Sequence, residues 1–244
     1  MSATPRFFGL VVEGPSDART IPNVVDRILV HEVTGLEGSL KSVRTFGGLA
    51  AGSTFLAWRG VNHEAKGRVP RKHGPFSGAP AVEDARTAWY ALQCFVGRDP
   101  QPDAVFLVRD SDGKQDERRK GLEQARDEAG WPFPVLIGVA HTMMECWVLS
   151  AFVPQDKKEI AALAASRKEL GFDPTVRSDE LTALNKVVQK RPKQVLSKLT
   201  EGDEAREAQC WQEANIEHLR ARGAKNGLAD FLGQVEDKLL PLAS

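Results

Sequence analysis

The sequence is poor in cysteine, in net charge and in long apolar runs. Its three cysteines, Cys94, Cys146 and Cys210, are widely spaced and form no CxxC pair, which argues against a disulfide framework and a zinc site. Lysine plus arginine number 33, as do aspartate plus glutamate, so no overall positive charge indicates nucleic acid and any such binding must depend on local patches. With no run of about 18 apolar residues and no signal peptide, we expect a cytoplasmic protein that has no membrane contact.

Two further absences narrow the function. The sequence has no G-x-x-x-x-G-K-[ST] motif, so any ATP hydrolysis must come from another chain. It also has no Gly/Ser linker, internal repeat or low-complexity tract. With 244 residues, 41% of them hydrophobic, the chain is long enough for one large α/β domain, or for one domain with a helical appendage.

Strand-like and helix-like patterns alternate over the first 153 residues. Apolar runs of strand length predict strands at 6–12, 40–46, 104–108 and 133–140. Apolar residues at helical spacing predict helices at 17–31, 49–59, 82–96, 115–129 and 143–152. Residues 60–80, rich in glycine, proline and basic side chains, are expected to form a long loop. This alternation is typical of an α/β fold with a mostly parallel sheet covered by helices on both faces.

The pattern changes after residue 153, where charge density rises and strand-like runs stop. The predicted helices are at 156–169, 178–199, 203–221 and 225–240, and Pro192 is expected to break or restart the second of them. We therefore predict an α/β domain over residues 1–153 and a helical C-terminal extension over residues 154–244. The sequence leaves open whether this extension packs on the sheet.

Acidic residues follow two of the predicted strands. Glu13 comes directly after the first strand in "LVVEGPSDA", and Asp110 and Asp112 follow another in "VFLVRDSDG". Ligands of parallel α/β sheets bind at the carboxyl ends of strands, and alternate residues of an extended backbone share a face. Clustered carboxylates repel one another unless a cation lies between them, and hard divalent cations prefer oxygen ligands. The sequence therefore predicts that Glu13, Asp110 and Asp112 bind Mg²⁺ or Mn²⁺.

These two motifs together resemble the Toprim signature, in which a Glu follows the first strand and a D-x-D follows a later one. The resemblance covers residues 6–150. Within the Toprim group, the chain is similar to the small OLD-like proteins that carry a helical tail. The resemblance implies a Rossmann-like Toprim fold and Mg²⁺-dependent cleavage of phosphodiester bonds by Glu13, Asp110, Asp112 and Glu145. It also implies that Asp17 is a metal ligand beside Glu13, Asp110 and Asp112.

The same resemblance suggests a biological setting. OLD-like Toprim proteins are often paired with an ABC-type ATPase in bacterial phage-defence loci, so it implies a nuclease effector that such a partner controls. The only tyrosine, Tyr90, lies in a predicted helix with an apolar setting, which argues against a topoisomerase. A non-catalytic Toprim-like interaction module, bound to an ATPase or a nucleic acid, is the alternative function.

Each candidate residue also has a structural interpretation. Glu13 can simply be solvated, and Asp110 to Gly113 can form a turn that caps the next helix. Asp17 can favour the dipole of the helix that it begins, and Glu145 can reach water from its own helix start. Basic side chains of the long loop are candidates for nucleic-acid contact: Lys66, Arg68, Arg71 and Lys72. DNA versus RNA, the number of metal ions and homo-oligomerisation stay open.

Overall fold

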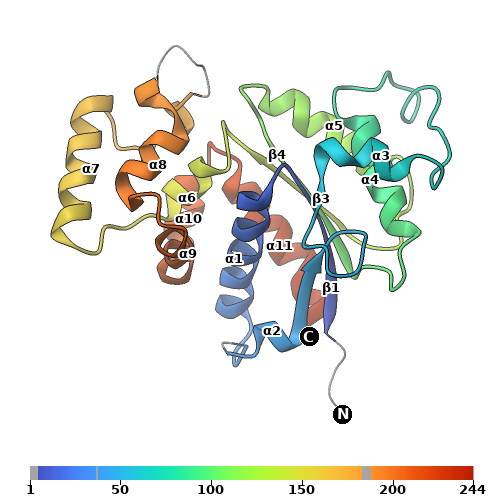
Figure 1. Ribbon diagram of the computed structural model, residues 1–244, viewed down its shortest axis with the longest axis horizontal. Helices are drawn as coiled ribbons and strands as arrows, with labels where there is room; N and C mark the ends of the chain where they lie inside the picture. Colours follow the sequence, from blue (N-terminus) through green and yellow to red (C-terminus); the bar gives the residue numbers. More distant parts are fainter. Residues whose placement is uncertain (1–4, 37, 183–187, 244) are drawn as a thin grey trace.

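The sheet at the centre of the molecule is parallel, and its strands run in the order β2, β1, β4, β5, with β3 beside β1 (Figure 1). This computed structural model describes residues 5–36, 38–182 and 188–243. The strands are β1 (Arg6–Val12), β2 (Arg44–Gly47), β3 (Leu56–Ala57), β4 (Ala104–Asp110) and β5 (Val135–Ala140). The predicted α/β class, with a parallel sheet flanked by helices, is confirmed.

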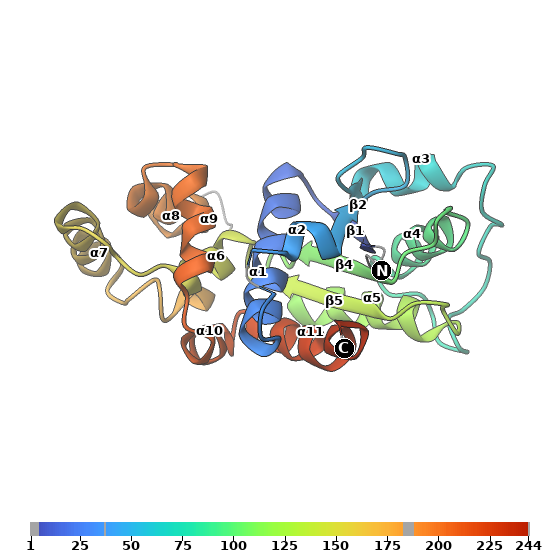
Figure 2. The same cartoon turned by 90° about the horizontal axis from the view of Figure 1, so that it is seen from below.

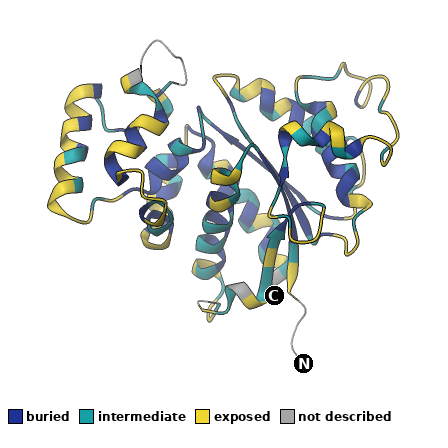
Figure 3. Cartoon of the chain, viewed as in Figure 1, coloured by how far each residue is buried: buried dark blue, intermediate teal, exposed yellow. Residues whose placement is uncertain are grey.

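Helices cover both faces of the sheet, because alternate residues of a strand point to opposite sides. In β1, Leu10 and Val12 belong to one apolar core and Val11 belongs to the other. The first core is closed by α1 and α11 and the second by α4 and α5. The bounds are α1 (Pro15–Glu32), α4 (Ala85–Val96), α5 (Gln115–Asp127) and α11 (Leu228–Ala243). Burial on both sides explains why the strands are unbroken apolar runs (Figure 3).

The C-terminal helices follow β5 in the sequence, and the last of them packs against the sheet again. They are α6 (Glu145–Ala151), α7 (Lys157–Leu170), α8 (Pro192–Thr200), α9 (Glu204–Glu213) and α10 (Ile216–Gly223), followed by α11. α7 and α8 lie at one end of the molecule, and the loop before α4 lies at the other (Figures 1 and 2). Trp147, Trp211 and Phe231 share the core of β1 and α1. The core is therefore continuous across residue 153, while a division into two domains stays a prediction.

Side chains of α11 cover the outer edge of β5. Gln234 accepts a hydrogen bond from the backbone N–H of Ile137 at 2.9 Å and donates one to the carbonyl of the same residue at 2.8 Å. Lys238 donates to the carbonyl of Val135 at 2.7 Å. Backbone groups at the edge of a sheet otherwise invite pairing with another chain. The edge strand is thus satisfied within the chain, at a place that its own sequence does not reveal.

Most of the predicted elements are found within a few residues of their expected bounds. These include the strands predicted at 6–12, 104–108 and 133–140, and the helices predicted at 17–31, 82–96, 115–129, 143–152, 156–169 and 225–240. Pro192 begins α8, as its fixed backbone angle favours the first position of a helix. The helical C-terminal region is confirmed.

Other boundaries were wrong for local reasons. The helix predicted at 49–59 is a turn through Gly52, whose φ of +77° disfavours a helix, followed by β3 and a 3-10 turn at Trp58–Gly60. The strand predicted at 40–46 is half helix, because α2 (Leu40–Val43) precedes β2. The loop predicted at 60–80 contains a short helix, α3 (Val61–Ala65).

Two further differences concern the C-terminal helices. The helix predicted at 203–221 is divided at Asn215, which has an extended backbone and whose side chain accepts from His218 N–H at 3.1 Å to cap α10. The helix predicted at 178–199 includes residues 183–187, which lie outside the described residues, and a 3-10 turn begins it at Ser178–Glu180. Every helix in the described part of the chain is too short or too polar to span a bilayer.

Candidate metal and phosphodiester site

Glu13 and Asp17 lie where β1 turns into α1. Gly14 has an extended backbone and precedes Pro15, the first residue of the helix. Asp17 Oδ2 accepts hydrogen bonds from the backbone N–H groups of Glu13 at 3.1 Å and Gly14 at 3.2 Å. Asp17 therefore caps the helix, as its structural interpretation expects, and the same bonds hold the Glu13 backbone in place.

The carboxyl group of Asp17 is nevertheless close to other acids. Burial raises the pKa of Asp17 to about 6, against the lowering effect of its hydrogen bond to Gly14, and the charges of Glu13 and Glu145 add to the increase. An acid that only capped a helix in water would have a lowered pKa. Asp17 is thus both a cap and a member of an acidic cluster.

Asp110 is the last residue of β4 and lies deepest in this cluster. Its Oδ1 accepts a hydrogen bond from the backbone N–H of Met144 at 2.7 Å, which fixes the side chain against the start of α6. Burial, followed by the charges of three neighbouring carboxylates, raises the pKa of Asp110 to about 9. Those neighbours are Asp17, Glu13 and Glu145. Segments from β1, β4 and α6 therefore bring four acids together at the carboxyl edge of the sheet.

Glu145, at the start of α6, faces a cleft of about 240 Å³ between α1 and the C-terminal helices. Burial raises its pKa, and the charge of Lys193 opposes that increase. The cleft also contains Arg19, which pairs with Glu204 at 2.5 Å, and Glu207, whose pKa burial raises as well. Glu145 thus connects the acidic cluster with the helical C-terminal region, a position that its sequence context does not show.

Asp112 lies apart from these four acids. β4 ends at Asp110, and Asp112 has a φ of +48°, so the extended backbone on which the shared face of the two aspartates was predicted is not present. Its side chain is 51% exposed and pairs with Arg118 Nη2 at 3.0 Å. The expected common orientation was therefore wrong, while Asp112 as a metal ligand stays a prediction.

Glu13 has a cationic neighbour that sequence reasoning missed. Its Oε1 lies 3.0 Å from Nε of Arg109, the residue before Asp110, yet neither atom makes a well-aligned hydrogen bond with a described residue. The Arg109 guanidinium also lies 5.2 Å from the centre of the Trp58 ring, whose indole N–H donates to the Val108 carbonyl at 2.6 Å. An arginine inside the apolar run "FLVRD" was the available signal, since a buried charge needs a partner.

The basic loop residues are not equivalent. Lys72 forms an ion pair with Glu128, and its ammonium group lies 5.0 Å from the centre of the Phe76 ring, so this side chain has a structural role. Arg68 pairs with Glu64 at 3.3 Å. Lys66 and Arg71 are exposed. Contact of nucleic acid with Lys66, Arg68, Arg71 and Lys72 stays a prediction, and it is weakest for Lys72.

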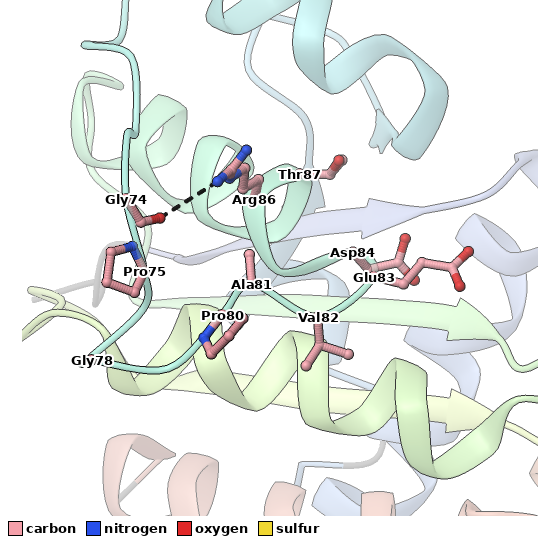
Figure 4. Close-up of a pocket in the computed structure, with 10 residues that line it drawn as sticks. All are labelled: Gly74, Pro75, Gly78, Pro80, Ala81, Val82, Glu83, Asp84, Arg86 and Thr87. Atoms are coloured by element: carbon pink, nitrogen blue, oxygen red, sulfur yellow. Dashed lines mark hydrogen bonds between the residues drawn. The ribbon is translucent and has the colours of Figure 1, made fainter.

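A hollow lies beside this loop, away from the acidic cluster. It has a volume of about 600 Å³ between Gly74, Pro75 and the start of α4 (Figure 4). Arg86 donates to the Gly74 carbonyl at 3.4 Å across it. Glu83 and Asp84 extend away from Gly74 toward the carboxyl ends of the strands (Figure 4). The hollow is therefore lined by the loop and the start of α4, and Asp84 is the lining residue that links it to the ion pairs of the acidic cluster.

The acidic cluster fits a hard divalent cation by its donor chemistry. It offers carboxylate oxygens from four half-buried acids, and Glu13 Oε1, which lies 3.0 Å from Arg109 Nε, has no hydrogen bond to a described residue. Within residues 5–36, 38–182 and 188–243, no three ligand side chains lie close enough together to form a metal shell. Asp110, Glu13, Asp17 and Glu145 are the residues that would hold such a cation, and Asp112 would join them after leaving Arg118.

No protein-family model, curated protein or solved structure matches this chain. The arrangement of its own residues is therefore what a functional proposal has to rest on.

Proposed function

We propose that this protein is a divalent-cation-dependent phosphodiester hydrolase, a nuclease of the OLD-like Toprim type. The observation that carries the proposal is Asp110, half-buried at the end of β4 near three further carboxylates, with a pKa raised to about 9. A buried cluster of like charges destabilises a fold, and such arrangements are concentrated at functional sites. A purely structural role of these four acids would not require them to lie close together.

The position of the cluster agrees with this proposal. The carboxyl edge of a parallel sheet is where α/β proteins bind phosphate-containing ligands. When bound there, Mg²⁺ or Mn²⁺ would stabilise negative charge on a phosphodiester and make a water molecule acidic enough to attack it. The chain's own residues orient the site: the Met144 N–H holds Asp110, and Asp17 fixes the turn that presents Glu13.

The proposed substrate is DNA or RNA, and the proposed regulator is a partner ABC-type ATPase in a bacterial defence system. Both come from the Toprim resemblance of "LVVEGPSDA" and "VFLVRDSDG". The chain has no nucleotide-binding loop of its own, so ATP-dependent control would require a second protein.

One observation favours the alternative, a non-catalytic Toprim-like module. Arg109 and Arg118 pair with Glu13 and Asp112, which neutralises two of the predicted ligands without a metal. In a module that no longer binds metal, such ion pairs would remain as structural links. Metal binding therefore separates the two functions more directly than fold does.

The test incubates purified protein with supercoiled plasmid and with total RNA in Mg²⁺ or Mn²⁺, beside Asp110→Asn and a control variant, Asp230→Asn. Asp230 is exposed and pairs with Arg119 at 2.8 Å, between α11 and α5. Cleavage by the wild type and Asp230→Asn, but not by Asp110→Asn, would support the nuclease. A wild type that takes up no divalent cation would rule it out in favour of the non-catalytic module.

A further inference from the structure

A chain of ion pairs connects the two predicted ligands that lie farthest from the centre of the cluster. Glu13 Oε1 lies 3.0 Å from Arg109 Nε, and Arg109 Nη1 lies 3.3 Å from Asp84 Oδ1. The other oxygen of Asp84 accepts from Arg118 Nη1 at 2.7 Å, and Arg118 Nη2 lies 3.0 Å from Asp112 Oδ2. Asp84, which precedes α4 and belongs to neither acidic motif, is therefore the shared partner of both arginines.

The middle of this chain is held firmly and its ends are not. Asp84 is 10% exposed and Arg118 is 8% exposed, and Arg118 Nε also donates to the Ser111 carbonyl at 3.1 Å. Arg109 is covered by Trp58. In contrast, 35% of the Glu13 side chain and 51% of the Asp112 side chain are exposed. Glu13 and Asp112 can therefore turn away from their arginines while Asp84 keeps both in place.

We propose that Asp84 is a positioning residue that sets how readily Glu13 and Asp112 are released from Arg109 and Arg118 to bind a divalent cation. This inference rests on the proposed function, since it assumes that the acids bind a cation. Three acids share two arginines, so each arginine is attracted to two carboxylates. A cation that binds Glu13 and Asp112 has to compete with these arginines, and Asp84 lowers the cost by remaining as their partner.

Opposite effects of two substitutions follow from this arrangement. Asp84→Asn leaves Glu13 and Asp112 as the acids that pair directly with Arg109 and Arg118, so those pairs tighten and cation affinity falls. Loss of a partner that orients metal ligands typically lowers affinity by about 10-fold to 100-fold, and we expect the lower end. Arg118→Gln keeps a donor for Asp84 and Ser111 but removes the charge that competes for Asp112, so affinity rises. A network that only supported the fold would weaken binding in both variants.

The experiment measures Mn²⁺ affinity of the full chain by isothermal titration calorimetry, and thermal unfolding without metal reports on folding. Glu159→Gln is the matched control, because Glu159 pairs with Arg206 at 2.6 Å with similar burial, between α7 and α9. We expect weaker binding in Asp84→Asn, tighter binding in Arg118→Gln and unchanged binding in Glu159→Gln. Unchanged binding in a folded Asp84→Asn, or weaker binding in Arg118→Gln, would overturn the inference alone. A wild type without Mn²⁺ binding would overturn the proposed function as well.

Discussion

Removing the charge of Asp110 should stabilise the metal-free protein. The pKa of this carboxyl rises from an ordinary value of 3.8 to about 9, because the group is buried among other acids. Folding therefore favours the protonated form, and holding the group ionised costs stability as pH rises. Asn has nearly the same shape and its oxygen can still accept from Met144 N–H, so Asp110→Asn replaces the protonated acid with little change in packing and removes the cost of protonating it on folding.

The size of the effect follows from the linkage between protonation and folding. At pH 7 the solution is about 3 pH units above the pKa of Asp110 in the unfolded state and still below its pKa in the folded state. Each of these units contributes 1.36 kcal/mol, so Asp110→Asn can raise the free energy of unfolding by at most about 4 kcal/mol. Below pH 4 the two proteins should unfold alike. As pH rises toward 9 the wild type should lose stability relative to Asp110→Asn.

Urea unfolding in EDTA, repeated from pH 4 to pH 9, measures this difference. Mg²⁺ should then narrow the difference near neutral pH, because a ligand at 100 times its dissociation constant stabilises the native wild type by about 2.7 kcal/mol and Asp110→Asn should not bind it. A metal-free Asp110→Asn that is less stable than the wild type at pH 7 would show that Asp110 is a structural acid, and would refute the reasoning behind the site.

Three further outcomes can be checked by unfolding and binding measurements. Gly9→Ala should destabilise by about 1–3 kcal/mol, because a Cβ at this position would lie 2.7 Å from the Phe95 ring; an unchanged urea midpoint would contradict the close packing of α4 on β1. Gln234→Ala should cost about 1–3 kcal/mol by leaving both Ile137 backbone groups without their partner, with Gln209→Ala, whose side chain bonds the Glu213 side chain on the surface of α9, as the control. Lys72→Met should lower thermal stability while leaving nucleic-acid affinity unchanged, measured by fluorescence anisotropy; a weaker affinity in the folded variant would reinstate Lys72 as a substrate contact.

The site residues that lie at strand ends could be predicted from the sequence. Glu13 and Asp110 come directly after apolar runs, and parallel strands bring such positions to one edge. Asp112 was not within reach, because it lies beyond the end of β4 in a left-handed turn with Gly113, where strand alternation no longer applies. Period-two reasoning is valid only while the backbone stays extended.

The arginine network depends on tertiary packing instead. Arg109, Asp84 and Arg118 come from a strand, a loop end and a helix, and no local pattern indicates that their side chains meet. The same limit applies to α11: its apolar spacing predicts a helix with one buried face, but not that this face packs on β5 and α1. At Gly52 a local feature decides the structure instead: its positive φ forms a turn in a segment whose alanines favour a helix.

The covered edge of β5 has a consequence for self-association. Two copies of an α/β protein can join their sheets when edge strands present free backbone donors and acceptors. At Ile137 and Val135 these groups are already bonded to Gln234 and Lys238. A continuous sheet across two copies would have to displace α11 from this edge, so pairing of two copies through β5 is disfavoured.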